Sequence, residues 1–334
     1  GCRHYFGYPI TPQTEIAAYM AKRMPKIGGV FLQAESEVSA VNMVIGAAAS
    51  GVRVMTSSSS PGISLKSEGL SYMAGCDLPA LVVNVQRGGP GLGGIQPSQS
   101  DYFQATRGGG HGDYHMLVLA PNSVQEMAQL TIQGFALAEK YRMPCMLLAD
   151  GTMGQMMEPV ELPDTAPEMV EKPWALTGTG LSRKHNIINS LSLTPDELER
   201  WNIDRYARYA KVEADEVMYE EYLTEDADVC VVGYGIAARV ARNAVNAARA
   251  KGIKAGMFRP ITLWPFPKAA LNKLASTCRA FISVELSMGQ LIEDVELAIR
   301  CSRPVTLCNR TGGMIPSPDE VLEAIRNAAK GVNE

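Results

Sequence analysis

Four short polar segments in the first hundred residues each follow an apolar run that is typical of a β-strand. They read YPITP (residues 8–12), ESE (35–37), TSSSSPG (56–62) and RGGPGLGG (87–94). Hydroxyls, carboxylates, one arginine and many glycines are concentrated in these segments. Parallel strands end at one edge of a sheet, so these segments would converge there. The pattern predicts a binding site for a small anionic ligand that contains a ring.

The two carboxylates of the second segment, Glu35 and Glu37, lie where a strand ends and a helix begins. One interpretation is favourable interaction with the helix dipole, which stabilises acidic residues in a first turn. The helix that follows is apolar, however, so at least one carboxylate can point into a covered crevice. A carboxyl group held there can share a proton with a ring nitrogen.

Arg87 stands at the end of a strand, ahead of a glycine-rich loop. Glycines allow a ligand to approach the backbone closely. The guanidinium can bind a carboxylate through two parallel hydrogen bonds, or it can form an exposed salt bridge. The spacing alone leaves both interpretations open.

Other motifs carry less information. Gly233 and Gly235 lack the third glycine and the acidic residue of a dinucleotide fingerprint, which favours a tight strand-to-helix turn. His111 and His115 have no metal-ligating companion in the sequence, so we expect a structural role in their loop. The seven cysteines are scattered and include no C-x-x-C pair, which indicates reduced thiols in a cytoplasm rather than a zinc or iron–sulfur site.

Apolar runs alternate with helical patterns in two parts of the chain. This alternation predicts an α/β fold with parallel sheets. We expect one domain over residues 1–160, a linker with a charged helical arm over 161–225, and a smaller α/β domain over 226–334. The arm is either a solvated connector or a contact for a partner chain.

The composition narrows the class of protein. Of the 334 residues, 46% are hydrophobic and 20% are charged, which is typical of globular domains with substantial cores. A formal net charge of −4 argues against nucleic acid and anionic membranes as partners. No apolar run is long enough for a transmembrane helix. The chain begins at Gly1, directly before strand-like residues, so we expect an earlier segment to be missing.

Several long motifs together resemble the alpha-type subunit of 2-oxoacid:ferredoxin oxidoreductases, and in particular the 2-oxoisovalerate (3-methyl-2-oxobutanoate) enzymes. The resemblance covers essentially the whole chain. It is carried by GYPITPQTEI, QAESEVSAVNMVIGAAASG, TSSSSPGISLKSEGLSYMAG, NVQRGGPGLGGIQPSQSDYFQATRGGGHGDYH, RPITLWPFP, MGQLIEDVELAI and RTGGMIP.

The resemblance implies a fold and a cofactor. The first domain would be the pyrimidine-binding domain of a thiamine diphosphate enzyme, truncated at its N-terminus, and the last would resemble a transketolase C-terminal domain. Thr11 would face the reacting carbon, Glu37 would bind the aminopyrimidine ring and Arg87 the substrate carboxylate. The remaining cofactor contacts would come from Pro9, Ile10 and Ser59.

The resemblance also implies an assembly. Mg²⁺ and [4Fe-4S] clusters would lie on partner subunits, and no metal would lie on this chain. The partners would be a beta subunit with the diphosphate-binding domain, gamma and ferredoxin-like subunits, ferredoxin, coenzyme A and a 2-oxo acid. The alternatives are a scaffold subunit without catalytic residues and a thiamine-dependent decarboxylase that passes no electrons on.

The glycine-rich loop bears on the substrate. In relatives that act on 2-oxoglutarate, this loop carries more hydroxyl groups. Here we expect Leu92, Ile95 and Gln96 to line the substrate pocket, which favours a branched aliphatic 2-oxo acid. 2-Oxoglutarate is the second candidate, because Lys66 or Arg107 could reach the pocket and pair with its second carboxylate.

Overall fold

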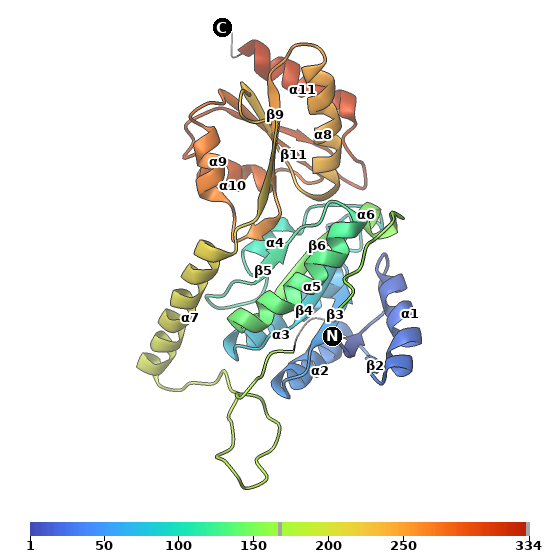
Figure 1. The fold of residues 1–334 in the computed structure, drawn as a ribbon, viewed down its shortest axis with the longest axis vertical. Coiled ribbons are helices and arrows are strands. Elements are labelled where there is room, and N and C mark those ends of the chain that lie inside the picture. The colour runs from blue at the N-terminus through green and yellow to red at the C-terminus, as the bar shows by residue number, and fades with distance from the viewer. Residues whose placement is uncertain (166–168, 332–334) are drawn as a thin grey trace.

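The computed structural model describes residues 1–165 and 169–331, which form two α/β units stacked along the long axis of the molecule (Figure 1). Each unit is built on its own sheet, one of seven strands and one of five. The predicted α/β class with parallel sheets is confirmed. Residues 166–168 of the predicted linker and 332–334 of the predicted second domain lie outside the described residues.

The seven-stranded sheet has the order β10-β5-β6-β4-β3-β1-β2. Six of its strands are parallel and come from the first part of the chain: β1 (His4–Gly7), β2 (Val30–Gln33), β3 (Val54–Ser58), β4 (Leu81–Gln86), β5 (Leu117–Leu119) and β6 (Cys145–Asp150). Strands β3 to β6 are buried on both faces and are accordingly continuous apolar or small-residue runs.

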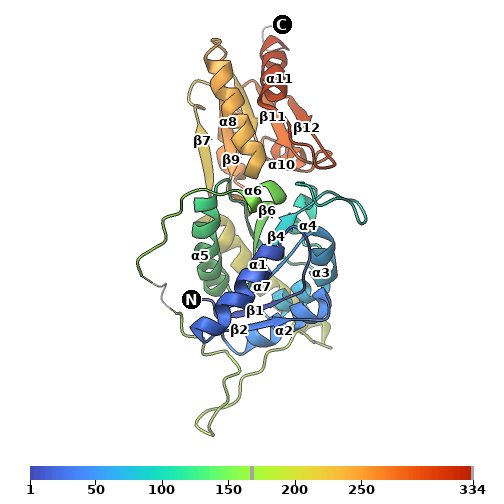
Figure 2. The ribbon, with the colours of Figure 1, turned by 90° about the vertical axis from the view of Figure 1, so that its right-hand side faces the viewer.

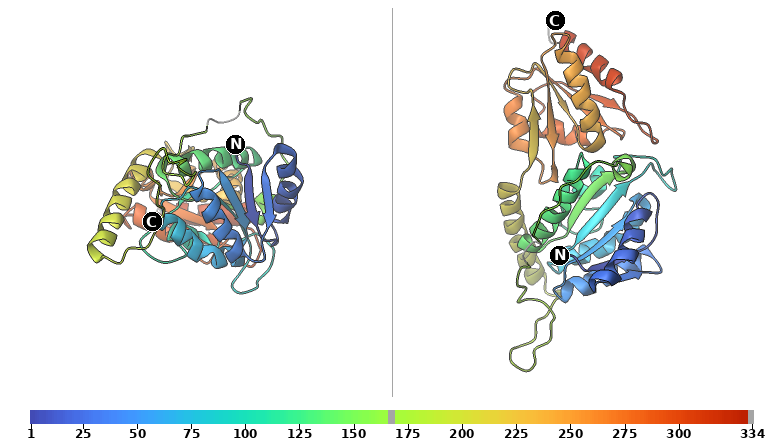
Figure 3. Two further views of the ribbon diagram at one scale, coloured as in Figure 1. Left: turned by 90° about the horizontal axis from the view of Figure 1, so that it is seen from below. Right: turned by 45° about the vertical axis from the view of Figure 1, so that its right-hand side comes forward.

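Helices cover both faces of this sheet (Figure 3). The helices on one face are α2 (Glu37–Ala49) and α3 (Ser60–Gly75), and those on the other are α1 (Thr14–Arg23) and α5 (Val124–Tyr141). Three shorter elements complete the unit: η1 (Met24–Ile27), α4 (Tyr102–Thr106) and α6 (Gly151–Gln155).

The helix starts follow the capping residues in the sequence. The Ser36 hydroxyl accepts a hydrogen bond from the Ser39 amide at the start of α2, and Ser123 accepts one from the Glu126 amide at the start of α5. The Glu126 carboxylate accepts from the Asn122 amide, one residue before the cap, and also pairs with Arg259.

The five-stranded sheet has the order β12-β11-β8-β9-β7, with β7 antiparallel to its neighbour. Its strands are β7 (Tyr219–Tyr222), β8 (Val229–Val232), β9 (Ala255–Pro260), β11 (Ala280–Glu285) and β12 (Val305–Asn309). Its helices are α8 (Gly235–Arg249), α9 (Lys268–Leu274), α10 (Leu291–Ala298) and α11 (Pro318–Gly331). Helices α8 and α11 lie together on one side, and α9 and α10 on the other (Figures 1 and 2).

Two segments join the units. Residues 156–165 and 169–194 contain no helix or strand, and α7 (Pro195–Asp215), which follows them, leads up to the small unit (Figure 1). Strand β10 (Thr262–Trp264) then crosses back and pairs antiparallel with β5 at the edge of the large sheet. A single apolar cluster therefore includes Tyr209 of α7, Trp264 of β10 and Phe281 of β11.

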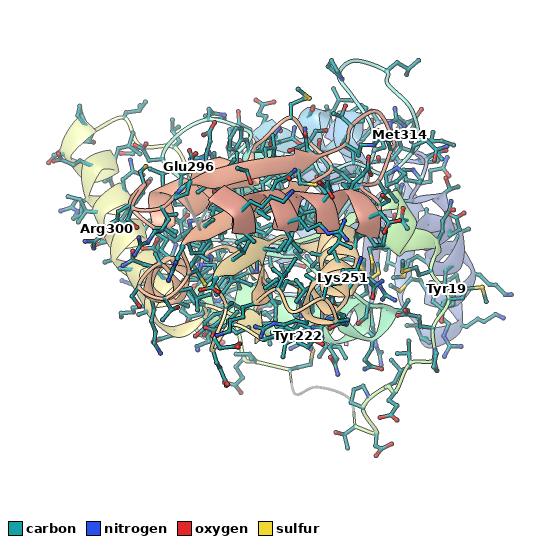
Figure 4. The ribbon with its side chains drawn as sticks, turned by 90° about the horizontal axis from the view of Figure 1, so that it is seen from above. Tyr19, Tyr222, Lys251, Glu296, Arg300 and Met314 are labelled. Atoms are coloured by element: carbon teal, nitrogen blue, oxygen red, sulfur yellow. The ribbon has the colours of Figure 1, made fainter. Side chains whose placement is uncertain are left out.

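The loop after β12 and the turn after α10 lie toward opposite ends of the small unit (Figure 4). In the side-chain view from above, Met314 in the loop after β12 lies toward the same end of the molecule as Tyr19 of α1, whereas Arg300 lies toward the opposite end (Figure 4). The loop after β12 therefore lies on the side where the glycine-rich loop extends from the large unit.

Candidate functional site

The four polar segments meet at one edge of the large sheet. The parallel strands β4, β3, β1 and β2 are neighbours in that order, so the residues that follow them lie side by side. Arg87 follows β4, Ser59 follows β3, Thr11 follows β1 and Glu37 follows β2. The carboxyl edge of a parallel sheet is where α/β proteins bind ligands.

The Tyr-Pro-Ile-Thr-Pro turn is supported from below by a buried polar chain. The Tyr5 hydroxyl and the Ser57 hydroxyl lie 2.6 Å apart, and Ser57 also contacts the Gln13 side chain. Gln13 is 1% exposed and donates to the Tyr8 carbonyl at 3.3 Å. With the turn held in this way, Pro9 and Thr11 are exposed and Ile10 is half-buried.

Glu37 is buried at the start of α2, with 6% of its surface exposed. Its carboxylate lies against Gly62, because a Cβ atom at Gly62 would be 2.8 Å from Glu37 Oε1 and 2.1 Å from Ser58 Oγ. Within the described residues, the buried hydroxyls of Ser58 and Ser59 have no hydrogen-bond partner. Buried polar groups without partners are uncommon, and here one of them, the Ser58 hydroxyl, lies beside a carboxylate.

Lys66 lies one helical turn beyond Gly62 on α3, on the same face of the helix. It is fully buried and donates to the Thr56 hydroxyl at 2.8 Å. Burial lowers the pKa of Lys66 to about 8, and the nearby negative charge of Glu37 opposes that shift. The ammonium therefore faces the core beneath Glu37 and does not extend toward the exposed edge.

Arg87 connects two of the loops. Its Nη1 donates to the Thr11 carbonyl at 2.9 Å and its Nη2 donates to the Leu92 carbonyl at 3.2 Å. Its Nε is buried and has no partner among the described residues. A guanidinium has five N–H donors, so three remain available after these two bonds.

Asp101 supports the strand end from which Arg87 projects. Its carboxylate accepts from the Ser60 hydroxyl at 2.7 Å and from the Asn84 amide at 2.9 Å. The Ser60 oxygen in turn accepts from the Arg87 amide at 3.0 Å. Burial raises the pKa of Asp101, and the hydrogen bonds from Ser60 and Asn84 oppose that shift.

Arg87, Ser60 and Asp101 line a hollow of about 440 Å³ between the two units, whose other wall includes Ser287 and Gln290. This is the size of a site for a small molecule. The Thr-Gly-Gly turn of the small unit closes one side, where a Cβ atom at Gly313 would lie 2.3 Å from the Cβ atom of Gln96. The small unit therefore shapes the glycine-rich loop.

The residues expected to form the substrate pocket lie on the outer part of that loop. Leu92 is 86% exposed and Ile95 is 54% exposed. Ile95 and Gln96 line a second hollow of about 390 Å³ together with Pro12 and Thr152. Leu92 lines neither hollow in this chain, so its side chain is available to whatever covers the loop.

Two cations that could have served as additional substrate ligands are engaged elsewhere. Lys66 is bound to Thr56 in the core, and Arg107 pairs with Asp294 at 3.4 Å and stacks on the Phe103 ring. His115 stacks on Trp264 at the junction of the units, where burial lowers its pKa. The amide of His111 donates to Ser71.

Sequence reasoning did not single out Ser60 or Asp101. The only available signal was a strand-end serine loop and an aspartate ahead of a short helix, and both are common. Their importance follows from contacts between segments that are far apart in the chain.

The residues present fit a ring-shaped cofactor with a basic nitrogen. A buried carboxylate and hydroxyls without partners among the described residues lie at the sheet edge, and Glu37 and Ser58 pack against a glycine that has no side chain to displace them. In residues 1–165 and 169–331, no group of three or more His, Cys, Asp or Glu side chains could hold a metal ion. Over the same residues, no helix has both the length and the apolar character needed to cross a membrane.

The fold and the matches to known families together place the chain among subunits of thiamine diphosphate-binding oxidoreductases. Residues 1–221 match the family described as pyruvate flavodoxin/ferredoxin oxidoreductase, thiamine diP-bdg, and residues 227–321 match pyruvate:ferredoxin oxidoreductase core domain II. The chain belongs to the 2-oxoacid:ferredoxin oxidoreductase family.

Similar proteins include the ketoisovalerate oxidoreductase subunit VorB of Methanothermobacter marburgensis, which is 52% identical over 100% of this chain and 95% of its own length. The 2-oxoglutarate synthase subunit KorA of Methanothermobacter thermautotrophicus is 38% identical over 97% of this chain and 93% of its own. Among solved structures, the 2-oxoglutarate:ferredoxin oxidoreductase of Magnetococcus marinus superposes with a TM-score of 0.85 and 30% identity. That match covers 98% of this chain and 62% of the other, so this chain corresponds to part of the longer protein.

Proposed function

We propose that this chain is one subunit of a thiamine diphosphate-dependent enzyme that oxidatively decarboxylates a branched-chain 2-oxo acid. The products are carbon dioxide, the acyl thioester of coenzyme A and two electrons, which pass to ferredoxin. The observation that carries the proposal is the buried Glu37 carboxylate beside the Ser58 hydroxyl, which has no partner among the described residues, at the same sheet edge as Thr11 and Arg87.

When bound, thiamine diphosphate would supply the electron sink that decarboxylation of a 2-oxo acid requires. Glu37 would hold a proton between its carboxylate and the aminopyrimidine nitrogen. Pro9, Ile10, Thr11 and Ser59 would form the walls around that ring. The three unused N–H groups of Arg87 would bind the substrate carboxylate, because charge-assisted bonds of this kind position an anion firmly.

The diphosphate, its Mg²⁺ and the [4Fe-4S] clusters would be held by other subunits. We place the diphosphate-binding domain on a beta subunit, with gamma and ferredoxin-like subunits completing a cytoplasmic complex. The exposed position of Thr11 and Leu92 supports this assignment, because a second chain would have to cover them to exclude water from the reacting groups.

The substrate assignment rests on the charges near Arg87. 2-Oxoglutarate has a second carboxylate that needs a partner when it is desolvated. Lys66 is fully buried in the core against Thr56, and Arg107 is paired with Asp294, so neither cation is directed to the substrate site. A branched aliphatic tail needs no such partner, and Leu92 and Ile95 provide apolar surface for it. The similarity to ketoisovalerate oxidoreductase subunits agrees with this choice.

The test is a steady-state comparison of 2-oxoisovalerate, pyruvate and 2-oxoglutarate on the purified complex, with a viologen as electron acceptor. Each buried methyl or methylene group contributes about 0.8 kcal/mol, so we expect a specificity constant for 2-oxoisovalerate tens of times that for pyruvate. A higher constant for 2-oxoglutarate would overturn the substrate assignment. Failure to oxidise any of the three would overturn the function.

A further inference from the structure

A separate polar cavity lies at the opposite edge of the large sheet. Its volume is about 220 Å³. The turn after α3 and Arg142 after α5 contribute to its walls, and these segments precede β4 and β6 at the amino ends of the strands. Residues 187–189 of the irregular segment and one side of α7 complete it. The cavity is therefore distinct from the candidate site at the carboxyl edge, where Glu37 and Arg87 lie.

Three arginines line this cavity around one aspartate. Arg208 forms an ion pair with the Asp77 carboxylate, and Arg205 Nε lies 3.7 Å from the same oxygen. Arg142 donates to the main-chain carbonyl of Asp77 at 3.2 Å and not to its carboxylate. The other acidic residue of the lining, Asp204, is exposed, so water screens its charge. The buried and half-buried residues of the cluster are three arginines and one aspartate, so their formal charges sum to a positive value.

Several donors of these arginines are unused. Arg205 is 8% exposed, and its Nη1 and Nη2 donate to Asn202 and to the Gly75 carbonyl. Among the described residues, the Nε atoms of Arg205 and Arg208 are buried and have no hydrogen-bond partner. Burial lowers the pKa of Arg142, an effect that Asp77 opposes and the nearby Arg208 charge reinforces. An anion in the cavity would satisfy these donors and compensate the excess charge.

We propose that this cavity is a binding site for a small oxyanion of the phosphate class. Guanidinium groups bind phosphate oxygens through paired hydrogen bonds, and three converging guanidiniums suit a tetrahedral anion better than a planar carboxylate. Two aromatic residues stiffen the site. Arg142 stacks on Trp174 with its guanidinium carbon 4.6 Å from the ring centre, and Trp201 of α7 forms part of the wall.

The bound anion would fasten α7 and the irregular segment to the large unit. Arg205 and Arg208 belong to α7, Arg142 belongs to the large unit, and residues 187–189 pass over the cavity. An anion that contacts all three arginines would therefore join segments far apart in the chain. The site is independent of the catalytic proposal, so the two can fail separately.

The primary test is calorimetric titration of the full chain with inorganic phosphate and with glycerol 3-phosphate. Similar affinities would identify free phosphate as the ligand, and tighter binding of the ester would identify the phosphate group of a larger molecule. Arg208→Gln should weaken phosphate binding about tenfold, because the loss of one charge-assisted hydrogen bond changes an affinity by about that factor. Arg142→Gln should weaken it similarly. Arg326→Gln, on the exposed side of α11, is the matched control and should have no effect.

Asp77→Asn should change the phosphate affinity in the opposite direction. It removes the competing carboxylate, so phosphate should bind several-fold more tightly. Asp77 has a φ of 53°, a conformation that asparagine adopts readily, so the variant should fold. A purely structural ion-pair cluster would not gain anion affinity in this variant.

Limited trypsin digestion gives a second readout. Arg183 and Lys184 are exposed in the segment that leads to the cavity, and phosphate should slow cleavage there in the wild type but not in Arg208→Gln. Binding weaker than about 10 mM in the wild type would overturn the proposal. Unchanged affinity in Arg208→Gln, Arg142→Gln and Asp77→Asn would also overturn it.

Discussion

Arg87 Nη1 donates a hydrogen bond of 2.9 Å to the main-chain carbonyl of Thr11, across 76 residues of sequence. The residue that would bind the substrate carboxylate thus also holds the turn that would face the reacting carbon. A second bond from the same guanidinium holds the glycine-rich loop through the Leu92 carbonyl. Loss of the planar group would therefore disturb binding and positioning together.

Arg87→Lys tests this coupling. Lysine keeps the charge but cannot bind two carbonyls and a carboxylate at once, so we expect kcat/KM for 2-oxoisovalerate to fall about 100-fold, with a raised KM and a lowered kcat. Steady-state kinetics on the complex measure both. Arg107→Lys, which alters an arginine at the junction of the units, should change kcat/KM by less than about threefold. If Arg87→Lys raised KM and left kcat unchanged, the position of Thr11 would not depend on the Arg87 guanidinium.

Glu37→Gln tests the proposed proton carrier. The amide has the same shape but cannot hold a proton between itself and a ring nitrogen, so turnover should fall by about 10²–10⁴ while assembly is unchanged. Viologen reduction and size-exclusion chromatography measure the two properties. Glu35→Gln is the matched control, because Glu35 is exposed two residues earlier and should be dispensable. Near-normal turnover of Glu37→Gln would remove this residue from the mechanism.

Lys66→Met should stabilise the chain at neutral pH. Burial lowers the pKa of Lys66 from 10.5 to about 8, so the unfolded chain binds more protons than the folded chain between those pH values. Its contribution to the free energy of unfolding therefore rises with pH from about 8 to 10.5, and the cost is fully present below pH 8. Methionine removes that cost, which we expect to be about 3 kcal/mol at pH 7.

Denaturant unfolding of both proteins at several pH values between 7 and 10 measures the difference. The advantage of Lys66→Met should shrink as the pH rises toward 10. Lys211→Met, on the exposed side of α7, controls for a general effect of removing a positive charge. A constant advantage at all pH values would mean that Lys66 is not the titrating group.

The parts of the fold that the sequence predicted are local. Each strand and the polar segment after it are contiguous, so the apolar run before Arg87 and the capping serine before Glu37 could be recognised without knowledge of the rest of the chain. Right-handed connections between parallel strands then place the segments at one edge. The convergence of Thr11, Ser59, Glu37 and Arg87 on neighbouring strands follows from those rules.

The parts that could not be predicted depend on pairing between distant segments. Nothing in the residues 262–264 indicates that this strand leaves the small unit and pairs with β5. Leu92 is apolar, and nothing in the residues of its loop indicates that its side chain is 86% exposed in this chain. Lys66 follows a helical pattern that is equally compatible with a solvent-facing lysine, and only the packing of α3 on β3 places it inside.

Gly62→Ala tests the geometry around Glu37 without removing any polar group from the protein. A methyl group at this position would lie 2.8 Å from Glu37 Oε1 and 2.1 Å from Ser58 Oγ, both closer than real Cβ contacts allow. The carboxylate is the flexible end of a side chain, so it should move and the helix should persist. We expect turnover at least tenfold lower, with unchanged assembly and helix content.

The matched control for this variant is Gly46→Ala on α2, the helix that begins with Glu37. Gly46 is exposed, and a Cβ atom there would meet nothing within 4 Å. Alanine should therefore keep full turnover and raise the free energy of unfolding by about 1 kcal/mol, because glycine weakens a helix interior. Viologen-linked turnover, circular dichroism and denaturant unfolding distinguish the two variants. If Gly62→Ala keeps full turnover, then the position of the Glu37 carboxylate seen here does not govern the reaction.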